Sequence, residues 1–74
     1  MREAFVPVQK TVELAGTGDT VEDAIQAALD RAQSTLEGVT SFEVRTVAGT
    51  VQDGRTVYRV ELRVWFTLLE RLHG

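Results

Sequence analysis

The stretch VQDGRTVYRVELRVWFTLL, residues 51–69, decides the fold by two features. Its second half alternates, and one parity is apolar or aromatic throughout: Tyr58, Val60, Leu62, Val64, Phe66 and Leu68. A period of two predicts a strand with one side turned to a core. Before this strand, Asp53-Gly54 is a dipeptide that favours the tight turn of a β-hairpin. The stretch therefore predicts a long strand that is entered from a hairpin turn.

The strand on the other side of the turn is expected to include Phe42 and Val44 as core residues. Counted back from the turn, their parity does not match that of Val60 and Leu62. One extra residue in this strand restores the match, and we expect a β-bulge near Ala48-Gly49.

The residues before the hairpin predict a strand and then a helix. Val8 to Leu14 is rich in β-branched residues and alternates loosely, which favours a half-buried strand. Thr20 and Asp23 approximate a capping box, so the helix is expected to begin there. Gly38 is a residue type typical of the position after a helix. Between these limits apolar residues recur at helical spacing: Val21, Ile25, Ala28, Leu29, Ala32 and Leu36.

These elements predict an α+β fold of order β-α-β-β. A right-handed crossover from the first strand leaves a gap that the last strand fills, antiparallel to both neighbours. The expected result is a three-stranded antiparallel sheet of order 1-3-2 packed on one helix. Residues 1–74 form a single domain, with residues 1–7 as an N-terminal extension and residues 69–74 as a C-terminal tail.

The composition predicts an oligomer. A chain of 74 residues buries only about 60% of the surface that it exposes when unfolded, and the sequence has no cysteine for a disulfide or thiolate metal site. Association between subunits is the remaining source of stability. A net charge of −3 and a pI of about 5.0 argue against nucleic-acid binding. With neither a signal-peptide pattern nor an apolar run that spans a bilayer, we expect a cytoplasmic protein without membrane partners.

Catalysis has little support in the sequence. Ser34, Ser41 and the threonines have no internal histidine as a base, because His73 stands near the C-terminal end. The opposite side of the last strand holds a different kind of candidate. Trp65 shares it with the charged residues Arg59, Glu61 and Arg63. Two interpretations stay open: an aromatic ligand stacks on this side, or Trp65 fills a groove of a neighbouring subunit.

Several segments together resemble the dodecin family of small flavin-binding proteins. They are VQKTVELAGTG from Val8, AIQAALDRAQSTL from Ala24, FEV from Phe42, VQDG from Val51 and YRVELRVWF from Tyr58. The resemblance covers residues 8–68. It implies a β-α-β-β subunit in a hollow dodecamer that stores flavins in pairs at subunit contacts. In the family each flavin ring stacks on a tryptophan and is hydrogen-bonded by a glutamine.

The chain departs from the family pattern at both of these residues. The family tryptophan directly precedes FEV, and that place is held by Ser41; the glutamine follows the aromatic residue that opens the last strand, and that place is held by Arg59. Serine offers no ring to stack on, and arginine is a donor without an acceptor. We therefore expect weak binding of a neutral flavin and a better fit for an anionic ligand or a flavin phosphate.

The sequence leads to one function and one alternative. The function is a non-catalytic, dodecin-like homo-oligomer that binds or stores riboflavin, FMN or a related aromatic cofactor near Ser41, Arg59 and Trp65. The resemblance implies that the oligomer is a dodecamer. The alternative is a flavin-poor structural shell, stabilised by calcium as in some members of the family. No calcium ligands are assigned in this sequence.

Overall fold

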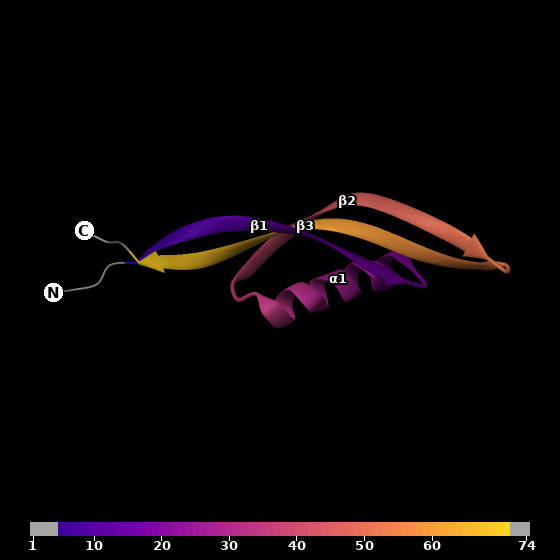
Figure 1. Cartoon of the computed structure of the whole chain (residues 1–74), viewed down its shortest axis with the longest axis horizontal. Coiled ribbons are helices and arrows are strands. Elements are labelled where there is room, and N and C mark those ends of the chain that lie inside the picture. Colours follow the sequence, from indigo (N-terminus) through magenta and orange to yellow (C-terminus); the bar gives the residue numbers. More distant parts are fainter. Residues whose placement is uncertain (1–4, 72–74) are drawn as a thin grey trace.

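The computed structural model describes residues 5–71, which form four elements (Figure 1). They are β1 (Phe5–Gly18), α1 (Val21–Thr35), β2 (Val39–Gln52) and β3 (Arg55–Arg71). The strands form one antiparallel sheet of order β1-β3-β2, and α1 lies along one side of it. The predicted element order and sheet topology are confirmed. Residues 1–4 and 72–74, including His73, lie outside the described residues.

The outer strand β1 and the central strand β3 are longer than the sequence pattern indicated. β1 begins at Phe5 instead of Val8, and β3 continues to Arg71, so that Phe5 pairs with Arg71 and Pro7 with Leu69. Pro7 is tolerated because β1 is an edge strand, where one side needs no N–H donor. Parts of the expected extension and tail therefore form a two-stranded ribbon that projects beyond the helix (Figure 1).

The helix begins at the predicted N-cap, but Gly38 does not directly follow its C-cap as predicted. Thr20 is the N-cap, and its hydroxyl oxygen accepts a hydrogen bond from the Asp23 N–H at 3.0 Å. The helix ends at Thr35, and Gly38 lies beyond its C-cap with a φ of 71°. There the Thr67 N–H donates to the Gly38 carbonyl oxygen at 3.0 Å, and a Cβ on residue 38 would lie 2.8 Å from the Thr67 carbonyl oxygen. Glycine is required here for close approach to β3 as well as for its backbone angle.

The hairpin between β2 and β3 has the predicted turn, but the predicted bulge position is wrong. Asp53 and Gly54 have φ angles of 50° and 76°, as a two-residue hairpin turn of type I′ requires. Ala48 and Gly49 pair regularly with β3, and the extra residue is Arg45, between Val44 and Thr46. The parity count required one extra residue but did not locate it, because a bulge does not need glycine.

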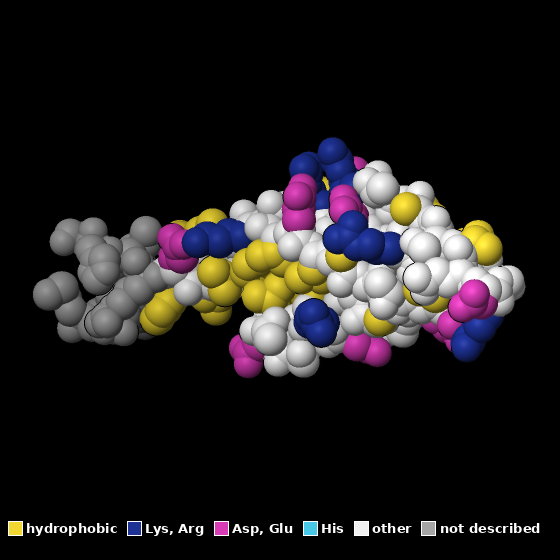
Figure 2. All heavy atoms as spheres, turned by 45° about the vertical axis from the view of Figure 1, so that its right-hand side comes forward, with side chains coloured by type: hydrophobic (Ala, Val, Ile, Leu, Met, Phe, Trp, Pro, Cys, Tyr) yellow, Lys and Arg dark blue, Asp and Glu magenta, His cyan; other side chains and the backbone are white. Residues whose placement is uncertain are grey.

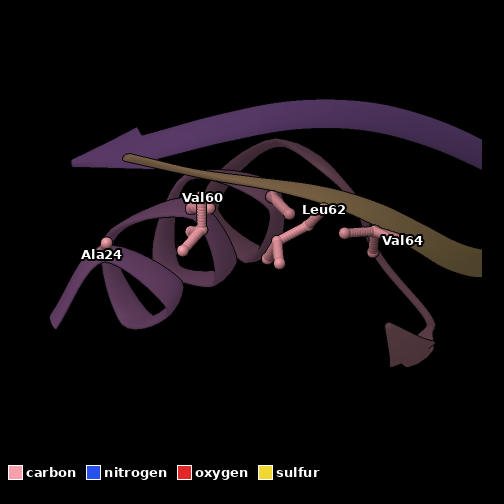
Figure 3. Packing of buried hydrophobic residues seen from close by; sticks show 6 residues of the cluster. Ala24, Val60, Leu62 and Val64 are labelled. Atoms are coloured by element: carbon pink, nitrogen blue, oxygen red, sulfur yellow. The ribbon is translucent and has the colours of Figure 1, made fainter. Parts of the chain in front are cut away.

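A stripe of alanines brings the helix close to the sheet. Ala24, Ala28 and Ala32 are buried against Val60, Leu62 and Val64 of β3 (Figure 3). On β1, a Cβ at Gly16 would lie 2.3 Å from the Ala24 carbonyl oxygen, so only glycine fits beneath the helix. Small side chains on both elements allow this approach, and the larger branched residues of β3 fill the space between them.

β2 remains uncovered on the side that faces the helix. Phe42 is 45% exposed and Val44 is 37% exposed, although both have the parity of the core residues on β3. Their expected burial is therefore wrong for a single chain, because α1 lies over β1 and β3 and barely reaches β2. Figure 2 shows further hydrophobic side chains at the surface where the helix meets the strands. The subunit folds with a substantial part of its apolar surface open.

Candidate ligand-binding face

The side of the sheet away from α1 carries most of the charged side chains of the strands, and Figure 2 shows charges of both signs gathered there. We call this side the open face. Its residues follow from the strand register: Thr11, Glu13, Ala15 and Thr17 of β1; Ser41, Glu43, Arg45 and Thr46 of β2; Arg59, Glu61, Arg63 and Trp65 of β3.

Trp65 stands on the open face between two small hydroxyl residues. It pairs with Thr11 on β1 and with Ser41 on β2, and its side chain is partly exposed. Thr40 is the extra residue of a second irregularity in β2, and its hydroxyl donates to the Trp65 carbonyl oxygen at 3.4 Å. We call Thr11, Trp65 and Ser41 the aromatic row. Because both neighbours are small, they leave room around the indole for a planar group.

Three ion pairs balance the charges of the open face. Arg63 pairs with Glu13 across strands at 2.9 Å, whereas the other two pairs join residues two apart on one strand. These are Arg45 with Glu43 and Arg59 with Glu61, each at 2.8 Å. All three are at least partly exposed, and such pairs contribute no more than about 1 kcal/mol each. A ligand or a neighbouring subunit therefore rearranges them at little cost.

A cavity of about 520 Å³ lies across the three strands. Its size is typical of a site for a small ligand, for which roughly 300 to 1,000 Å³ is usual. Its lining combines charged and neutral residues: Glu13, Leu14, Ala15, Arg45, Thr46, Arg59, Glu61 and Leu62. The cavity borders the aromatic row, because Glu13 stands two residues from Thr11 on β1. The open face thus offers a ligand the indole ring of Trp65 and a polar cavity next to the aromatic row.

The bulge in β2 shapes this cavity. Arg45 is hydrogen-bonded to Glu43 on the open face, and the next residue, Thr46, pairs with Glu61 on the same face. Without a bulge, successive side chains of a strand point to opposite sides. The extra residue therefore places two polar side chains in succession on one side of the sheet.

The three predicted site residues do not converge in one subunit. Ser41 and Trp65 lie directly opposite each other across β2 and β3. Arg59 stands six residues from Trp65 on the same strand, about 20 Å away at 3.3 Å per residue, and lines the cavity without Ser41 or Trp65. Ser41 and Trp65 belong to the aromatic row, and Arg59 belongs to the cavity.

Sequence reasoning missed Arg45 and Thr46 as site residues. Strict alternation from Phe42 and Val44 puts Thr46 on the core side of the sheet and Arg45 on the opposite side. The pattern therefore assigns Arg45 and Thr46 to different sides of the sheet. The required extra residue was a signal that one side chain of β2 would be redirected. Its position became known only from the pairing of β2 with β3.

Neither a metal centre nor a membrane span is found in residues 5–71. The described side chains include no group of three or more histidine, cysteine, aspartate or glutamate residues that would hold an ion. No helix in this part of the chain is long and apolar enough to cross a membrane.

The fold and the open face define a small α+β subunit with a candidate site for an aromatic ligand. The dodecin family model matches residues 8–69. Dodecin from Thermus thermophilus is 48% identical over 65 residues, which cover 85% of this chain and 94% of that protein. The chain therefore belongs to the dodecin family, whose members are non-catalytic, flavin-binding oligomers.

Solved structures agree with this assignment. A crystal structure of a single-substitution variant of T. thermophilus dodecin has a TM-score of 0.82 at 46% identity, and covers 88% of this chain and 100% of that chain. Dodecin from Streptomyces davaonensis gives 0.80 at 32% identity, with 86% and 97% covered. Dodecin from Streptomyces coelicolor gives 0.80 at 35% identity, with 86% and 94% covered. The β-α-β-β subunit is thus shared over most of the chain.

Proposed function

We propose that this chain assembles into a closed homo-oligomer of twelve copies that stores a flavin or related aromatic cofactor, with the ring stacked on Trp65. The observation that carries the proposal is the pairing of Trp65 with Ser41. The family resemblance expects a stacking ring at the position of Ser41. Neighbouring strands lie about 4.8 Å apart, so Trp65 offers an indole one strand away on the same face.

The exposed apolar surface supports assembly. Phe42, Val44 and Val47 of β2 are only partly covered within the described chain. The subunit is 65 Å long but only 18 by 14 Å across, too thin to bury these residues by itself. Further copies of the chain would cover this surface, since apolar area removed from water contributes about 25 cal/mol per Å².

The aromatic row supports a planar ligand. A flavin ring on the indole gains stacking energy of about 1 kcal/mol beyond the area that it buries. The hydroxyl groups of Thr11 and Ser41 flank the ring and supply both donors and acceptors for its polar edge. The dodecin family consists of non-catalytic, flavin-binding proteins, which is the class of function proposed here.

A structural shell is the second candidate, and the partial exposure of the large aromatic side chain of Trp65 favours it. In this arrangement the indole packs into a neighbouring subunit, and the exposed ion pairs of the open face exchange partners across the contact. Calcium ions held at the contacts between subunits would stabilise such a shell further. The two candidates differ in what Trp65 contacts, so they respond differently to its removal.

Riboflavin titration of the purified oligomer tests the proposal, with flavin fluorescence and native mass spectrometry as readouts. Wild type should quench the fluorescence as a dodecamer. Trp65→Ala should weaken binding about tenfold with the assembly intact, and Trp65→Phe should fall between the two. If Trp65→Ala breaks the oligomer and wild type does not quench riboflavin or FMN, the shell is correct. Unchanged affinity in an intact Trp65→Ala oligomer would exclude Trp65 as the platform.

A further inference from the structure

A row of charged residues follows the aromatic row on the open face. Glu13 of β1 and Glu43 of β2 both pair with Arg63 of β3, so the three residues lie side by side across the sheet. We call them the charged row. Each member stands two residues from a member of the aromatic row on its own strand. At 3.3 Å per residue the two rows are roughly 7 Å apart, which is within reach of one fused aromatic ring.

Arg63 is the least exposed of the three paired arginines of the open face. Its Nη2 atom donates to Glu13 Oε1 at 2.9 Å across two strands, whereas Arg45 and Arg59 pair with acids of their own strand. The side chain of Arg63 is 34% exposed, against 45% for Arg45 and 58% for Arg59. The cross-strand ion pair thus holds this guanidinium over the sheet, next to the aromatic row.

Arg63 keeps donors for a further acceptor. Within residues 5–71 its hydrogen bond to Glu13 uses Nη2. A guanidinium has five N–H donors in a planar fork, so the remaining donors can bind acceptors of a ligand. The row on the other side of the aromatic row differs, because it holds the uncharged residues Gln9 and Thr67. The two ends of a ring stacked on Trp65 therefore meet different surroundings.

We propose that Arg63 donates hydrogen bonds to the carbonyl edge of a flavin ring that stacks on Trp65, and so selects among aromatic ligands. This inference rests on the proposed function and names a specificity-determining residue for it. One edge of the pyrimidine part of a flavin ring carries a carbonyl oxygen next to a ring nitrogen, and both are acceptors. Two parallel N–H donors of a guanidinium suit such an edge, as they suit a carboxylate. The ligand class is a fused aromatic ring with acceptors at one end.

A contact between Arg63 and Trp65 alone is the alternative. The two residues are neighbours on one side of β3, and a guanidinium over an indole is itself a favourable contact. In that arrangement Arg63 supports the platform equally for every ring that stacks on it. Two probes separate the alternatives. Lumiflavin has the flavin ring without the ribityl chain, and phenazine is a planar molecule of three fused rings without carbonyl groups.

The experiment titrates the purified oligomer with lumiflavin and with phenazine in a calorimeter, and native mass spectrometry confirms the assembly of each variant. Arg63→Gln should weaken lumiflavin binding about tenfold, because hydrogen bonds to a charged group are lost, and should leave phenazine binding unchanged. Arg63→Lys keeps the charge but loses the fork, so its lumiflavin affinity should lie between the two. It also gives the comparison in an intact oligomer if Arg63→Gln does not assemble.

Arg55→Gln is the matched control, because it removes the same charge from the start of β3, beside the hairpin turn. It should keep both wild-type affinities, so an equal loss of lumiflavin affinity in Arg55→Gln would show that only net charge matters and overturn the inference. Equal losses for lumiflavin and phenazine in the Arg63 variants, or no loss for lumiflavin, would overturn it while the proposed function stands. If wild type binds no flavin ring, the proposed function fails and this inference fails with it.

Discussion

β2 and β3 carry apolar residues on the same side of one sheet, yet these residues differ in burial. Val60, Leu62 and Val64 of β3 are fully buried, whereas Phe42 and Val44 of β2 stay exposed. The side chains are equally apolar, and each of the latter two pairs with a β3 core residue. Sequence pattern alone therefore does not distinguish the core of the subunit from its uncovered surface.

The width of the helix explains the difference. An α-helix with its side chains is about 10 Å wide, and strands are spaced by about 4.8 Å, so one helix covers two strands. Here α1 covers β1 and β3. A third strand at the edge needs a second layer from elsewhere, and in an oligomer another copy supplies it. Burial on β3 belongs to folding of the subunit, and the proposed oligomer assigns burial on β2 to assembly.

The largest effect is expected for Phe42→Asp, which introduces a charge on the uncovered side of β2. A charge buried between subunits without a partner is strongly destabilising, so the high-mass species should disappear in sedimentation velocity. Thr50→Asp is the control, because Thr50 lies on the same strand but on the other side. A Phe42→Asp protein that sediments like wild type would show that this surface of β2 is not a subunit contact.

Leu62→Ala tests the covered side and should act through folding. A buried leucine replaced by alanine loses about 2 to 5 kcal/mol of unfolding free energy, because a cavity remains. Chemical denaturation at a fixed protein concentration measures the loss, since assembly also contributes to stability. Val51→Ala, at a position that is 72% exposed, should change stability by much less. Similar losses in the two variants would break the contrast between β3 and β2.

Ser41→Trp sharpens the comparison on the open face, where the proposed stacking ring, Trp65, belongs to β3 and the family tryptophan would belong to β2. A second indole opposite Trp65 should tighten riboflavin binding by about tenfold, measured by fluorescence quenching. Ser41→Trp combined with Trp65→Ala then moves the ring from one strand to the other. Recovery of wild-type riboflavin affinity in this double variant would show that a ring at either position of the aromatic row, on β2 or on β3, can stack on the flavin. If Ser41→Trp gains no affinity as an intact oligomer, the aromatic row does not face the ligand.

The smallest effect is expected for deletion of residues 1–6, which removes Phe5 and Val6 from the end of β1. The rows from Val8 onward keep their pairing with β3, so the oligomer should remain and stability should fall by no more than about 1 kcal/mol. Native mass spectrometry and thermal unfolding measure both quantities. Loss of the dodecamer would show that the projecting ribbon is itself a subunit contact.

The sequence predicted the elements, their order, the hairpin and the buried side of β3, because alternation and turn residues are local signals. It did not predict how far α1 extends across the sheet, so Phe42 and Val44 were assigned to the core. The open face was predicted in part: alternation placed Trp65 and Arg59 on one side. Their separation of six residues along β3 follows from the sequence, whereas the place of Arg45 beside Thr46 depends on strand register, which no short segment encodes.

The unpaired residue at Arg45 is the one position of this part of β2 that the pairing with β3 does not need. If Arg45 were deleted, Thr46 and Val44 would become neighbours and would keep their partners Glu61 and Leu62, so the bulge would disappear and the pairing would stay regular. If the paired residue Glu43 were deleted instead, Phe42 would move by one position along β3 and turn to the open face. Two deletions of one codon, two residues apart, would thus have opposite consequences for the surface of the subunit. Native mass spectrometry should show the oligomer retained without Arg45 and lost without Glu43, with the strand content retained in circular dichroism in both.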